Sequence, residues 1–561
     1  MTPLASLRET VLAAAAELGG FNGEGEDGEA GTRGGIVLER PKRAQFGDYS
    51  TNAALLLAPG LKAPPREVAE RLGQALSERL GGSLSSFEVA GPGFLNLFLD
   101  DGWLIDALAA VLDAGDRYGS GGAAKPERVL VEFVSANPTG PMHVGHARNA
   151  AYGDALARIL QFHGHRVERE FYVNDAGSQV VMFGQTIGAL ARGEEVPEGG
   201  YKGDYVPELA ARIAGAGEMD PAALAHVAVE LMLESMKQTL TRFRVLPFDH
   251  WQYESVLHEG GSKSPVAHVL DLIDKKGLSY RSDGALWMRT TEFGDDKDRV
   301  LIRADGEHAK GEHTYFTSDI AYHQDKRERG FERQIDVWGA DHHGYVRRNK
   351  AAYAALGGDP DELDLLIMQL VHLMSSGERA QMSKRAGEFV TLEDLIEEIG
   401  VDAARWYLLA RSHDTTVDVD LDLAREQSSE NPVYYVQYAH ARIASVLRKV
   451  GEGRLDAALE SLRGSSEEQA EALHTSERAL VIELLAFPGE VAESAARRAP
   501  HRIAAYALAL AQSFTAFYRD CQVVGAEPEQ VESWRIALCV AAMRTIAGCL
   551  ELLGVEAPEH M

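Results

Sequence analysis

The 561-residue sequence predicts an α/β protein built around a Rossmann-like, doubly wound parallel sheet. Three observations predict this class. Strand-length apolar runs alternate with helical segments between about residues 128 and 391. Short helices and strands precede this part, and nearly everything beyond residue 431 has helical periodicity. We therefore expect an N-terminal α+β domain (1–118), a catalytic-type core (126–430) with a helical insertion near 180–260, and a C-terminal all-α helical bundle (431–561).

The first domain is predicted from amphipathic helices and short strands. The stretches MTPLASLRETVLAAAAELGG and REVAERLGQALSERL have helical periodicity, and GPGFLNLFL has the composition of a strand. Charged residues interrupt the first stretch, so we expect a helix there and not a secretion signal. The glycine-rich segments GGFNGEGEDGEAGTRGG and YGSGGAAKPE are expected to be a loop and a linker.

The second domain begins with a strand–helix–strand unit, RVLVEFVSA, GHARNAAYGDALARILQFHGH and RVEREFYVND, which implies a parallel sheet. We expect GALWMRT, DRVLIRADG, QIDVWGAD and LDLLIMQLVHLM to add strands to that sheet. The segments DIAYHQDKRERGF and GYVRRNKAAYAAL are expected to be helices between them. After Thr391 we expect helices alone, including NPVYYVQYAHARIASVLRKV, which Pro432 opens near its first turn.

Composition limits the function classes. The chain is 45% hydrophobic and 25% charged, and no run approaches the ~20 apolar residues that span a bilayer, so no membrane is expected. Its three cysteines, Cys521, Cys539 and Cys549, form no CxxC pair, which argues against disulfides and a cysteine zinc site and favours the cytoplasm. The net charge of −29 argues against a general nucleic-acid binder, although segregated charge can leave a basic track on an acidic body.

Two histidines stand where the first helix of the core begins, in SANPTGPMHVGHARN. His143 and His146 are three residues apart, so they share one face of the first turn, where backbone N–H groups favour anions. Gly145 leaves room for a flat group, and imidazole donors can neutralise charge that develops as pyrophosphate leaves. The pattern therefore suits a triphosphate. One alternative is that the histidines only cap the helix. Another is that they form half of a metal site, although the HExxH spacing of zinc hydrolases is missing.

A second polar stretch, SSGERAQMSKRAGEF, follows a strand-like run about 240 residues later. It indicates a loop that carries Lys384 and Arg385, and a loop lysine that closes over phosphates is a recurring device in nucleotidyl transfer. A solvated charged loop is the alternative. In GADHHG, a glycine and a carboxylate at a strand end can meet a nucleotide ribose. A zinc site at its two histidines is the less favoured alternative.

HVGH and MSKR together resemble the two signature sequences of class I aminoacyl-tRNA synthetases. The strings SANPTGPMHVGHARN, YVNDAGSQ, GDDKDRVLIRADG, TYFTSDIAYH and GADHHGY resemble the arginyl-tRNA synthetase family, as do FGDYSTN, GPGFLNLFL and NPVYYVQYAHARI. The resemblance covers essentially the whole chain. It implies an aminoacyl-tRNA ligase that forms arginyl-adenylate and pyrophosphate from arginine and ATP. Arginine then passes to the terminal ribose of tRNA(Arg), and tRNA is needed for efficient activation.

The resemblance also implies roles for individual residues. A planar guanidinium calls for carboxylate and aromatic partners, and Tyr315 and Asp319 share one helix face four residues apart. A buried tyrosine beside a helix-start carboxylate is the alternative for this pair. The implied arginine-binding residues are Glu132, Ser135, Asn137, His146, Tyr315, Asp319 and His342. The implied ATP-binding residues are His143, Gly145, His146, Gly339, Asp341, Met382, Ser383 and Lys384, of which His143, His146 and Lys384 are expected to be catalytic.

Two surfaces are expected to bind tRNA. Phe94 and Asn96 lie on alternate residues of a strand, where a ring can stack on an RNA base and an amide can read its edge. Tyr434, Tyr438 and Arg442 lie at four-residue steps along one helix. The alternative is that these side chains belong to the protein core.

One departure from the family pattern concerns the second signature, where Gln381 replaces the usual lysine. Some relatives carry a substitute lysine just before the histidine signature, but Gly140 stands there. Arg385, Arg379 or a Mg²⁺ ion could supply the missing charge. We expect ATP to bind with Mg²⁺, no tightly bound cofactor or structural zinc, and a monomer. The rival functions are another class I nucleotidyl-transferring enzyme and a non-catalytic tRNA-binding paralogue.

Overall fold

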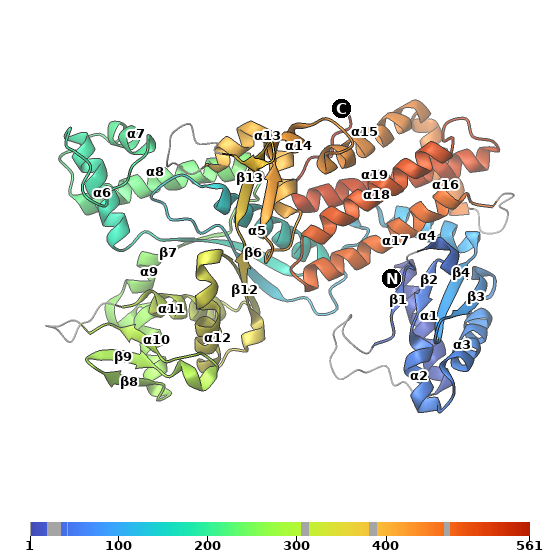
Figure 1. The fold of residues 1–561 in the computed structure, drawn as a ribbon, viewed down its shortest axis with the longest axis horizontal. Coiled ribbons are helices and arrows are strands. Elements are labelled where there is room, and N and C mark those ends of the chain that lie inside the picture. The colour runs from blue at the N-terminus through green and yellow to red at the C-terminus, as the bar shows by residue number, and fades with distance from the viewer. Residues whose placement is uncertain (1, 20–34, 42, 305–312, 381–389, 465–471) are drawn as a thin grey trace.

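A computed structural model describes residues 2–19, 35–41, 43–304, 313–380, 390–464 and 472–561 (Figure 1). The described elements follow the predicted class, with a small α+β unit, a parallel-sheet core and a helical bundle in chain order. In Figure 1 the blue N-terminal unit and the orange-to-red bundle lie side by side, and the core extends away from them. The predicted glycine-rich loop at 20–34 falls almost wholly outside the described residues.

The N-terminal unit is a four-stranded antiparallel sheet, in the order β1-β2-β4-β3, packed against helices. Helix α3 fits closely on the sheet, since a Cβ at Gly73 would lie 2.3 Å from the Phe87 ring. Helices and strands expected from REVAERLGQALSERL and GPGFLNLFL are present. The elements are α1 (Pro3–Leu18), β1 (Leu38–Glu39), β2 (Tyr49–Thr51), α2 (Ala53–Leu61), α3 (Pro65–Leu80), β3 (Leu84–Ala90), β4 (Phe94–Leu99) and α4 (Asp101–Ala114).

The core is a five-stranded parallel sheet in the order β12-β11-β5-β6-β7. The chain order reverses between β5 and β11, and in such sheets ligands bind outside the carboxyl ends of the strands at that switch point. The strands are β5 (Arg128–Glu132), β6 (Arg166–Val173), β7 (His250–Tyr253), β11 (Arg333–Gly339) and β12 (Leu363–Met368). The helices are α5 (Val144–His163), α9 (Glu254–His258), α10 (Pro265–Lys275), α11 (Tyr315–Glu328) and α12 (Val346–Ala355). Between β6 and β7 are inserted α6 (Ser178–Ala191), α7 (Tyr205–Arg212) and α8 (Pro221–Arg242).

Two strand predictions were wrong in where the strands pair, and a third was correct for only the first half of its segment. GALWMRT and DRVLIRADG contain β9 (Ala285–Met288) and β10 (Arg299–Ile302), which join β8 (Ser279–Ser282) in a separate antiparallel sheet. LDLLIMQLVHLM divides into β12 and β13 (Val371–Ser375), and β13 pairs with β14 (Glu378–Arg379) and with β15 (Val417–Asp420). Strand β15 also lies beyond Thr391, where we expected helices alone. Periodicity identifies a strand but carries no information about its partner.

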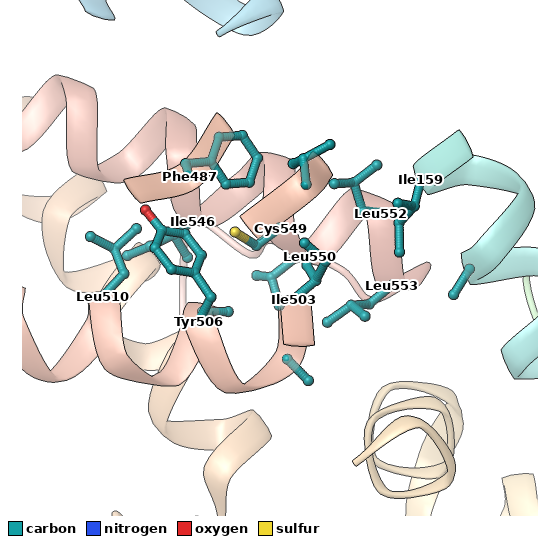
Figure 2. Close-up of a cluster of buried hydrophobic side chains, with 14 of the residues drawn as sticks. Ile159, Phe487, Ile503, Tyr506, Leu510, Ile546, Cys549, Leu550, Leu552 and Leu553 are labelled. Atoms are coloured by element: carbon teal, nitrogen blue, oxygen red, sulfur yellow. The ribbon is translucent and has the colours of Figure 1, made fainter. Parts of the chain in front are cut away.

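The C-terminal part is a helical bundle whose apolar core continues into the catalytic part. Figure 2 shows Phe487, Tyr506, Ile546 and Cys549 packed together, with Ile159 of α5 nearby. Its helices are α15 (Pro432–Val450), α16 (Glu452–Gly464), α17 (Thr475–Ala496), α18 (His501–Asp520) and α19 (Glu529–Leu553). The helices α13 (Leu392–Leu409) and α14 (Leu421–Arg425) precede it in the chain.

Helix α19 corrects the expectation that no run is apolar enough to span a bilayer. This 25-residue helix passes that test by length and composition, because an 18-residue window within it has a mean hydropathy of 1.9. The apolar window is 72% buried inside the protein, however, and α19 packs against α15, α16 and α18. The helix therefore has the surroundings of a core helix of the bundle.

Candidate active site

The two signature histidines cap the N-terminus of α5. The backbone N–H of Gly145 donates to Nδ1 of His143 (3.0 Å), and the backbone N–H of His143 donates to Nδ1 of His146 (3.2 Å). The two rings stack with their centroids 3.7 Å apart. Both histidines are therefore capping residues, as the alternative interpretation had it. Their capping contacts use Nδ1 alone, so Nε2 of each ring could still contact a ligand.

This capping fixes the proton of each imidazole. Because Nδ1 accepts a hydrogen bond in both rings, the neutral form of each must carry its proton on Nε2. Burial lowers the pKa of His143, and burial together with the neighbouring His143 lowers the pKa of His146 to about 3. Both side chains are therefore neutral Nε2–H donors at neutral pH. Gly145 permits the stacked arrangement, since a Cβ there would lie 2.8 Å from Cε1 of His143.

The chain returns to this turn directly after the second signature. The N–H of Val144 donates to the carbonyl of Val390 (3.1 Å), and the N–H of Leu392 donates to the carbonyl of Met142 (2.8 Å). His143 and Thr391 form an isolated antiparallel bridge. The predicted residues Met382, Ser383 and Lys384, together with Gln381 and Arg385, lie outside the described residues. The described residue that follows them, Val390, contacts the helix that carries the histidines.

The loop after β5 joins two predicted arginine-binding residues to one another. Val134 and Ser135 have φ values of 70° and 41°, a left-handed backbone that costs energy for residues other than glycine and recurs at functional sites. The Ser135 hydroxyl donates to Oε1 of Glu132 (2.9 Å) and accepts from the N–H of Tyr172 (3.1 Å). Glu132 is buried, and its Oε2 accepts from Lys326 (2.6 Å), whereas Asn137 is exposed. Glu132 and Ser135 are thus already bonded within the protein.

Tyr315 and Asp319 lie one turn apart at the start of α11. Tyr315 is 58% exposed, so the alternative of a buried tyrosine does not describe it, and Asp319 is half-buried. Burial raises the pKa of Asp319, against the opposing effects of His323 and His342. The first turn of α11 therefore presents an aromatic ring and a carboxylate that is costly to ionise.

A residue that the sequence did not single out, Glu254, completes an acidic cluster with Asp319 and Asp175. Glu254 directly follows β7 and is 6% exposed. Burial, followed by the charges of Asp319 and Asp175, raises its pKa to about 7. The sequence did hold a signal for Glu254, because an acidic residue directly after a strand of a parallel sheet stands where such sheets bind ligands. Among the described residues, no three His, Cys, Asp or Glu side chains come together as metal ligands, so these carboxylates lack the geometry of a metal site.

The residues after β11 act on both the signature histidines and the acidic cluster. The charge of Asp341 acts to raise the pKa of His143, and that of His342 acts to lower the pKa of Asp319. Gly339 permits a close approach, since a Cβ there would lie 2.6 Å from Oδ1 of Asp341. The loops after β5 and β11 therefore meet at the switch point, with the acidic cluster adjacent to them.

The predicted tRNA-binding residues lie away from this site. On β4, Phe94 is 41% exposed, but Asn96 is only 4% exposed and pairs in register with Ser50 and Glu88. On α15, the rings of Tyr434 and Tyr438 stack with centroids 6.1 Å apart, and Arg442 donates to the Tyr438 hydroxyl (3.5 Å).

The α15 stripe faces solvent at its centre. Tyr438 is 44% exposed and Arg442 is exposed, whereas the helix buries its opposite face, which includes Val436 and Ile443. The alternative of a core stripe therefore does not describe Tyr438 and Arg442.

Three family descriptions match the chain. Residues 5–99 match the arginyl tRNA synthetase N-terminal domain, residues 107–195 and 228–445 match the catalytic domain of tRNA synthetases class I (R), and residues 436–561 match the DALR anticodon binding domain. The chain is 45% identical over 545 residues to the arginine–tRNA ligase of Geobacillus thermodenitrificans, and 43% identical over 542 residues to that of Bacillus subtilis. Both alignments cover 94% of each chain.

A solved structure agrees with these relatives. The arginyl-tRNA synthetase of Thermus thermophilus superposes with a TM-score of 0.73 and 25% identity, covering 99% of this chain and 100% of that one. The sequence, its arrangement of domains and its fold thus lead to one conclusion: the chain belongs to the arginyl-tRNA synthetase family, within class I.

Proposed function

We propose that the switch point between β5 and β11 is where this chain performs the reaction of its family. The chain is a class I arginine–tRNA ligase, which activates L-arginine with ATP to arginyl-adenylate and pyrophosphate and then charges tRNA(Arg). The observation that carries the assignment of the site is the acidic cluster of Glu254, Asp319 and Asp175. The loop after β11 connects this cluster to the histidines, because His342 acts on Asp319 and Asp341 acts on His143.

The arginine side chain binds at the acidic cluster. A guanidinium offers five donors in a planar fork and one positive charge, which match the buried carboxylate of Glu254 and the half-buried carboxylate of Asp319. Burial raises the pKa of both Glu254 and Asp319, and neighbouring carboxylates add to the shift; a bound guanidinium opposes both effects. The exposed ring of Tyr315 can stack on the guanidinium plane, and His342 lies at the same edge. Glu132 and Ser135 shape the loop, while Asn137 and His146 hold the amino-acid backbone.

ATP enters as its Mg²⁺ complex and places its phosphates at the N-terminus of α5. There the backbone dipole and the Nε2–H groups of His143 and His146 stabilise the negative charge that develops as pyrophosphate leaves. Lys384 adds a positive charge from the second signature, with Met382 and Ser383 beside it. Gly339 and Asp341 hold the ribose, and Gly145 leaves the backbone accessible.

The tRNA lies along two surfaces that belong to different units. Phe94 stacks on an exposed base near the N-terminal unit, with Asn96 beside it. Tyr434, Tyr438 and Arg442 meet the anticodon loop. The domains extend over 1–118, 126–430 and 431–561, and the enzyme acts as a cytoplasmic monomer. Because the chain carries a net charge of −29, tRNA affinity depends on a narrow track and falls steeply with salt.

Charging of tRNA with labelled arginine, lysine or citrulline tests the function and its specificity. Arginine should be attached, lysine rejected for lack of the planar fork, and citrulline rejected for lack of charge. Attachment of citrulline at a rate similar to arginine would contradict a site built on carboxylates. Pyrophosphate exchange with each amino acid in turn separates this enzyme from other class I nucleotidyl transferases, and absence of any charged tRNA would favour a non-catalytic paralogue.

A further inference from the structure

A row of three buried carboxylates crosses the sheet beneath the proposed arginine site. Asp336 of β11, Glu132 of β5 and Glu170 of β6 are register partners on adjacent parallel strands, so they point to the same face. All three are at most 5% exposed. Three like charges this close destabilise the fold unless cations or bound protons neutralise them, and burial raises the pKa of Glu132 against the opposing effect of Lys326.

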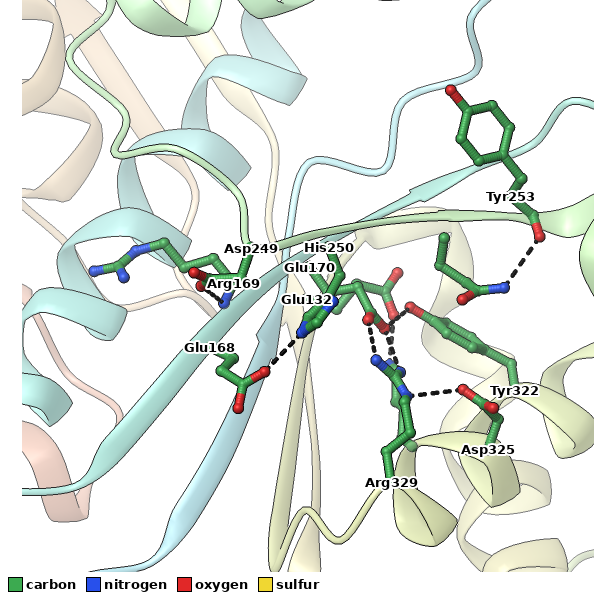
Figure 3. A network of polar contacts seen from close by, with 12 residues as sticks. Glu132, Glu168, Arg169, Glu170, Asp249, His250, Tyr253, Tyr322, Asp325 and Arg329 are labelled. Carbon is green, nitrogen blue, oxygen red and sulfur yellow. Dashed lines mark hydrogen bonds and ion pairs between the residues drawn. The ribbon is translucent and has the colours of Figure 1, made fainter.

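Helix α11 supplies those cations. Lys326 donates to Oε2 of Glu132 (2.6 Å) and to Oδ1 of Asp336 (2.8 Å). Arg329 donates to both oxygens of Glu170 (2.6 and 2.9 Å), and the Tyr322 hydroxyl donates to Oε1 of Glu170 (2.6 Å). Figure 3 shows Tyr322 and Arg329 reaching from this helix toward Glu170, with Asp325 beside Arg329.

The permanent charges of this row do not balance. Lys326 and Arg329 are two cations against three carboxylates, and Arg329 also contacts Asp325 (2.9 Å). Among the described residues with a hydrogen bond to the row, the remaining side chain able to become a cation is His323. This histidine is 4% exposed, and it lies one helical turn after Asp319.

The hydrogen bonds of His323 require a proton on each ring nitrogen. Nδ1 lies 2.8 Å from the backbone carbonyl oxygen of Asp319, which can only accept. Nε2 lies 2.8 Å from Oδ2 of Asp336. Burial acts to raise the pKa of Asp336, but Lys326 is the largest opposing influence and the pKa is lowered overall. Because Lys326 also donates to Oδ1 of Asp336, this carboxylate too can only accept. A neutral imidazole has one N–H and would leave one of these contacts without a hydrogen.

We propose that His323 is a buried imidazolium that fixes the Asp319 end of α11 and keeps the Asp319 carboxylate charged for the arginine guanidinium. The inference rests on the proposed arginine site. His323 is a positioning residue, because its contacts are to the Asp319 backbone and to Asp336 and not to substrate. Its positive charge is one helical turn from Asp319 and opposes the effect of burial on that carboxylate.

The groups that face His323 come from several elements and set its environment. The carboxylates favour the imidazolium, while Lys326 opposes it, and the Trp338 ring meets the imidazole edge with centroids 6.3 Å apart. The titratable and polar groups around it are Asp319, Tyr322 and Lys326 on α11, Gln334 and Asp336 on β11, Glu132 on β5, and His342 after β11.

The protonation state is tested directly by nuclear magnetic resonance of protein carrying ring-¹⁵N histidine. The chain has 19 histidines, and the His323→Asn spectrum identifies the signal of His323 by its loss. At pH 7 both ring nitrogens of His323 should carry a proton, as its two acceptor partners require. A neutral ring at neutral pH would overturn the inference, whatever the state of the arginine site.

The functional role is tested by the kinetics of His323→Asn, which keeps one donor and removes the charge. The arginine KM should rise about tenfold, the scale of one charged hydrogen bond, while the ATP KM stays within twofold. Asp319 must be ionised to bind a guanidinium. Loss of the His323 charge therefore moves the acid limb of kcat/KM for arginine to higher pH. If the His323→Asn protein does not fold, the same kinetics are measured with His323→Gln, which also removes the charge.

His440→Asn is the matched control. His440 is 3% exposed, and its Nδ1 likewise faces a backbone carbonyl, that of Pro558 (2.8 Å), but it lies on α15. This variant should lose stability without a change in arginine KM. A normal arginine KM in His323→Asn would overturn the positioning role. A normal arginine KM in Asp319→Asn would instead contradict the proposed arginine site, while the resonance measurement on His323 would be unaffected.

Discussion

Glu254→Gln should make the protein more stable and a poorer enzyme. The carboxyl group of Glu254 is buried beside Asp319 and Asp175, which raises its pKa from 4.5 to about 7. In the unfolded chain the proton leaves near 4.5, and in the folded chain it leaves near 7. Between these values the folded state binds more protons, so the free energy of unfolding falls as the pH rises through this window and stays low above it.

The magnitude follows from the same values. A rise from 4.5 to about 7 corresponds to about 3 kcal/mol at 1.36 kcal/mol per pKa unit, an upper bound because local water and relaxation weaken the repulsion. Glutamine keeps the shape and removes the charge. We therefore expect Glu254→Gln to raise the free energy of unfolding by about 1–3 kcal/mol at pH 8 and by little near pH 4.5. Its arginine KM should rise roughly tenfold or more, as one charged partner of the guanidinium is lost.

Denaturant unfolding at the two pH values, and arginine-dependent pyrophosphate exchange in the presence of tRNA(Arg), measure these effects. Glu127→Gln is the matched control with the opposite sign, because Arg333, bonded to Glu127 at 2.8 Å, lowers the pKa of that carboxyl. Glu127→Gln should destabilise the protein at neutral pH and leave arginine KM unchanged. If Glu254→Gln were no more stable than the parent at pH 8, or used arginine normally, the placement of Glu254 in an acidic arginine pocket would be refuted.

Three further substitutions test other parts of the site. Lys384→Ala should lower the rate of pyrophosphate exchange by roughly 10²-fold, the scale of one lost transition-state contact, and an unchanged rate would remove Lys384 from the mechanism. Gly145→Ala should lower kcat by about tenfold or more, because its Cβ would lie 2.8 Å from the His143 ring; a variant with full activity would show that the stacked histidines are not needed. Phe94→Ala should raise the tRNA KM severalfold with no effect on arginine KM, measured by aminoacylation, since one base–aromatic stack contributes about 1–3 kcal/mol. Normal tRNA use by that variant would place the tRNA elsewhere.

The sequence could predict those parts of the site that depend on local patterns. HVGH follows a strand and begins a helix, and GADHHG follows another strand, so both were assigned to the carboxyl edge of a parallel sheet. In the structure the loops that carry HVGH and GADHHG follow β5 and β11, the two strands between which the chain order reverses. Fold class was predictable for the same reason, because alternating strand and helix patterns leave few arrangements.

The contacts between distant segments could not be predicted in this way. The charge of Asp319 raises the pKa of Glu254, although the two residues are 65 positions apart. The residues near Glu254 in the sequence do not indicate this contact, because it depends on the order of the strands in the sheet. The strands β9 and β10 were assigned to the wrong sheet for the same reason. A signal for two members of the carboxylate row did exist: Glu132 and Asp336 each interrupt an apolar strand, and a charge in a buried strand requires a partner. Glu170 gave no such signal, because its strand RVEREFYV carries several charges.

A crystal structure with a non-hydrolysable arginyl-adenylate analogue tests the assignment of this site most directly. The account predicts the guanidinium between the carboxylates of Glu254 and Asp319, and the phosphate-like group within hydrogen-bonding distance of Nε2 of His143 or His146. An analogue bound with its guanidinium away from both carboxylates, or with its phosphate-like group remote from the N-terminus of α5, would contradict it.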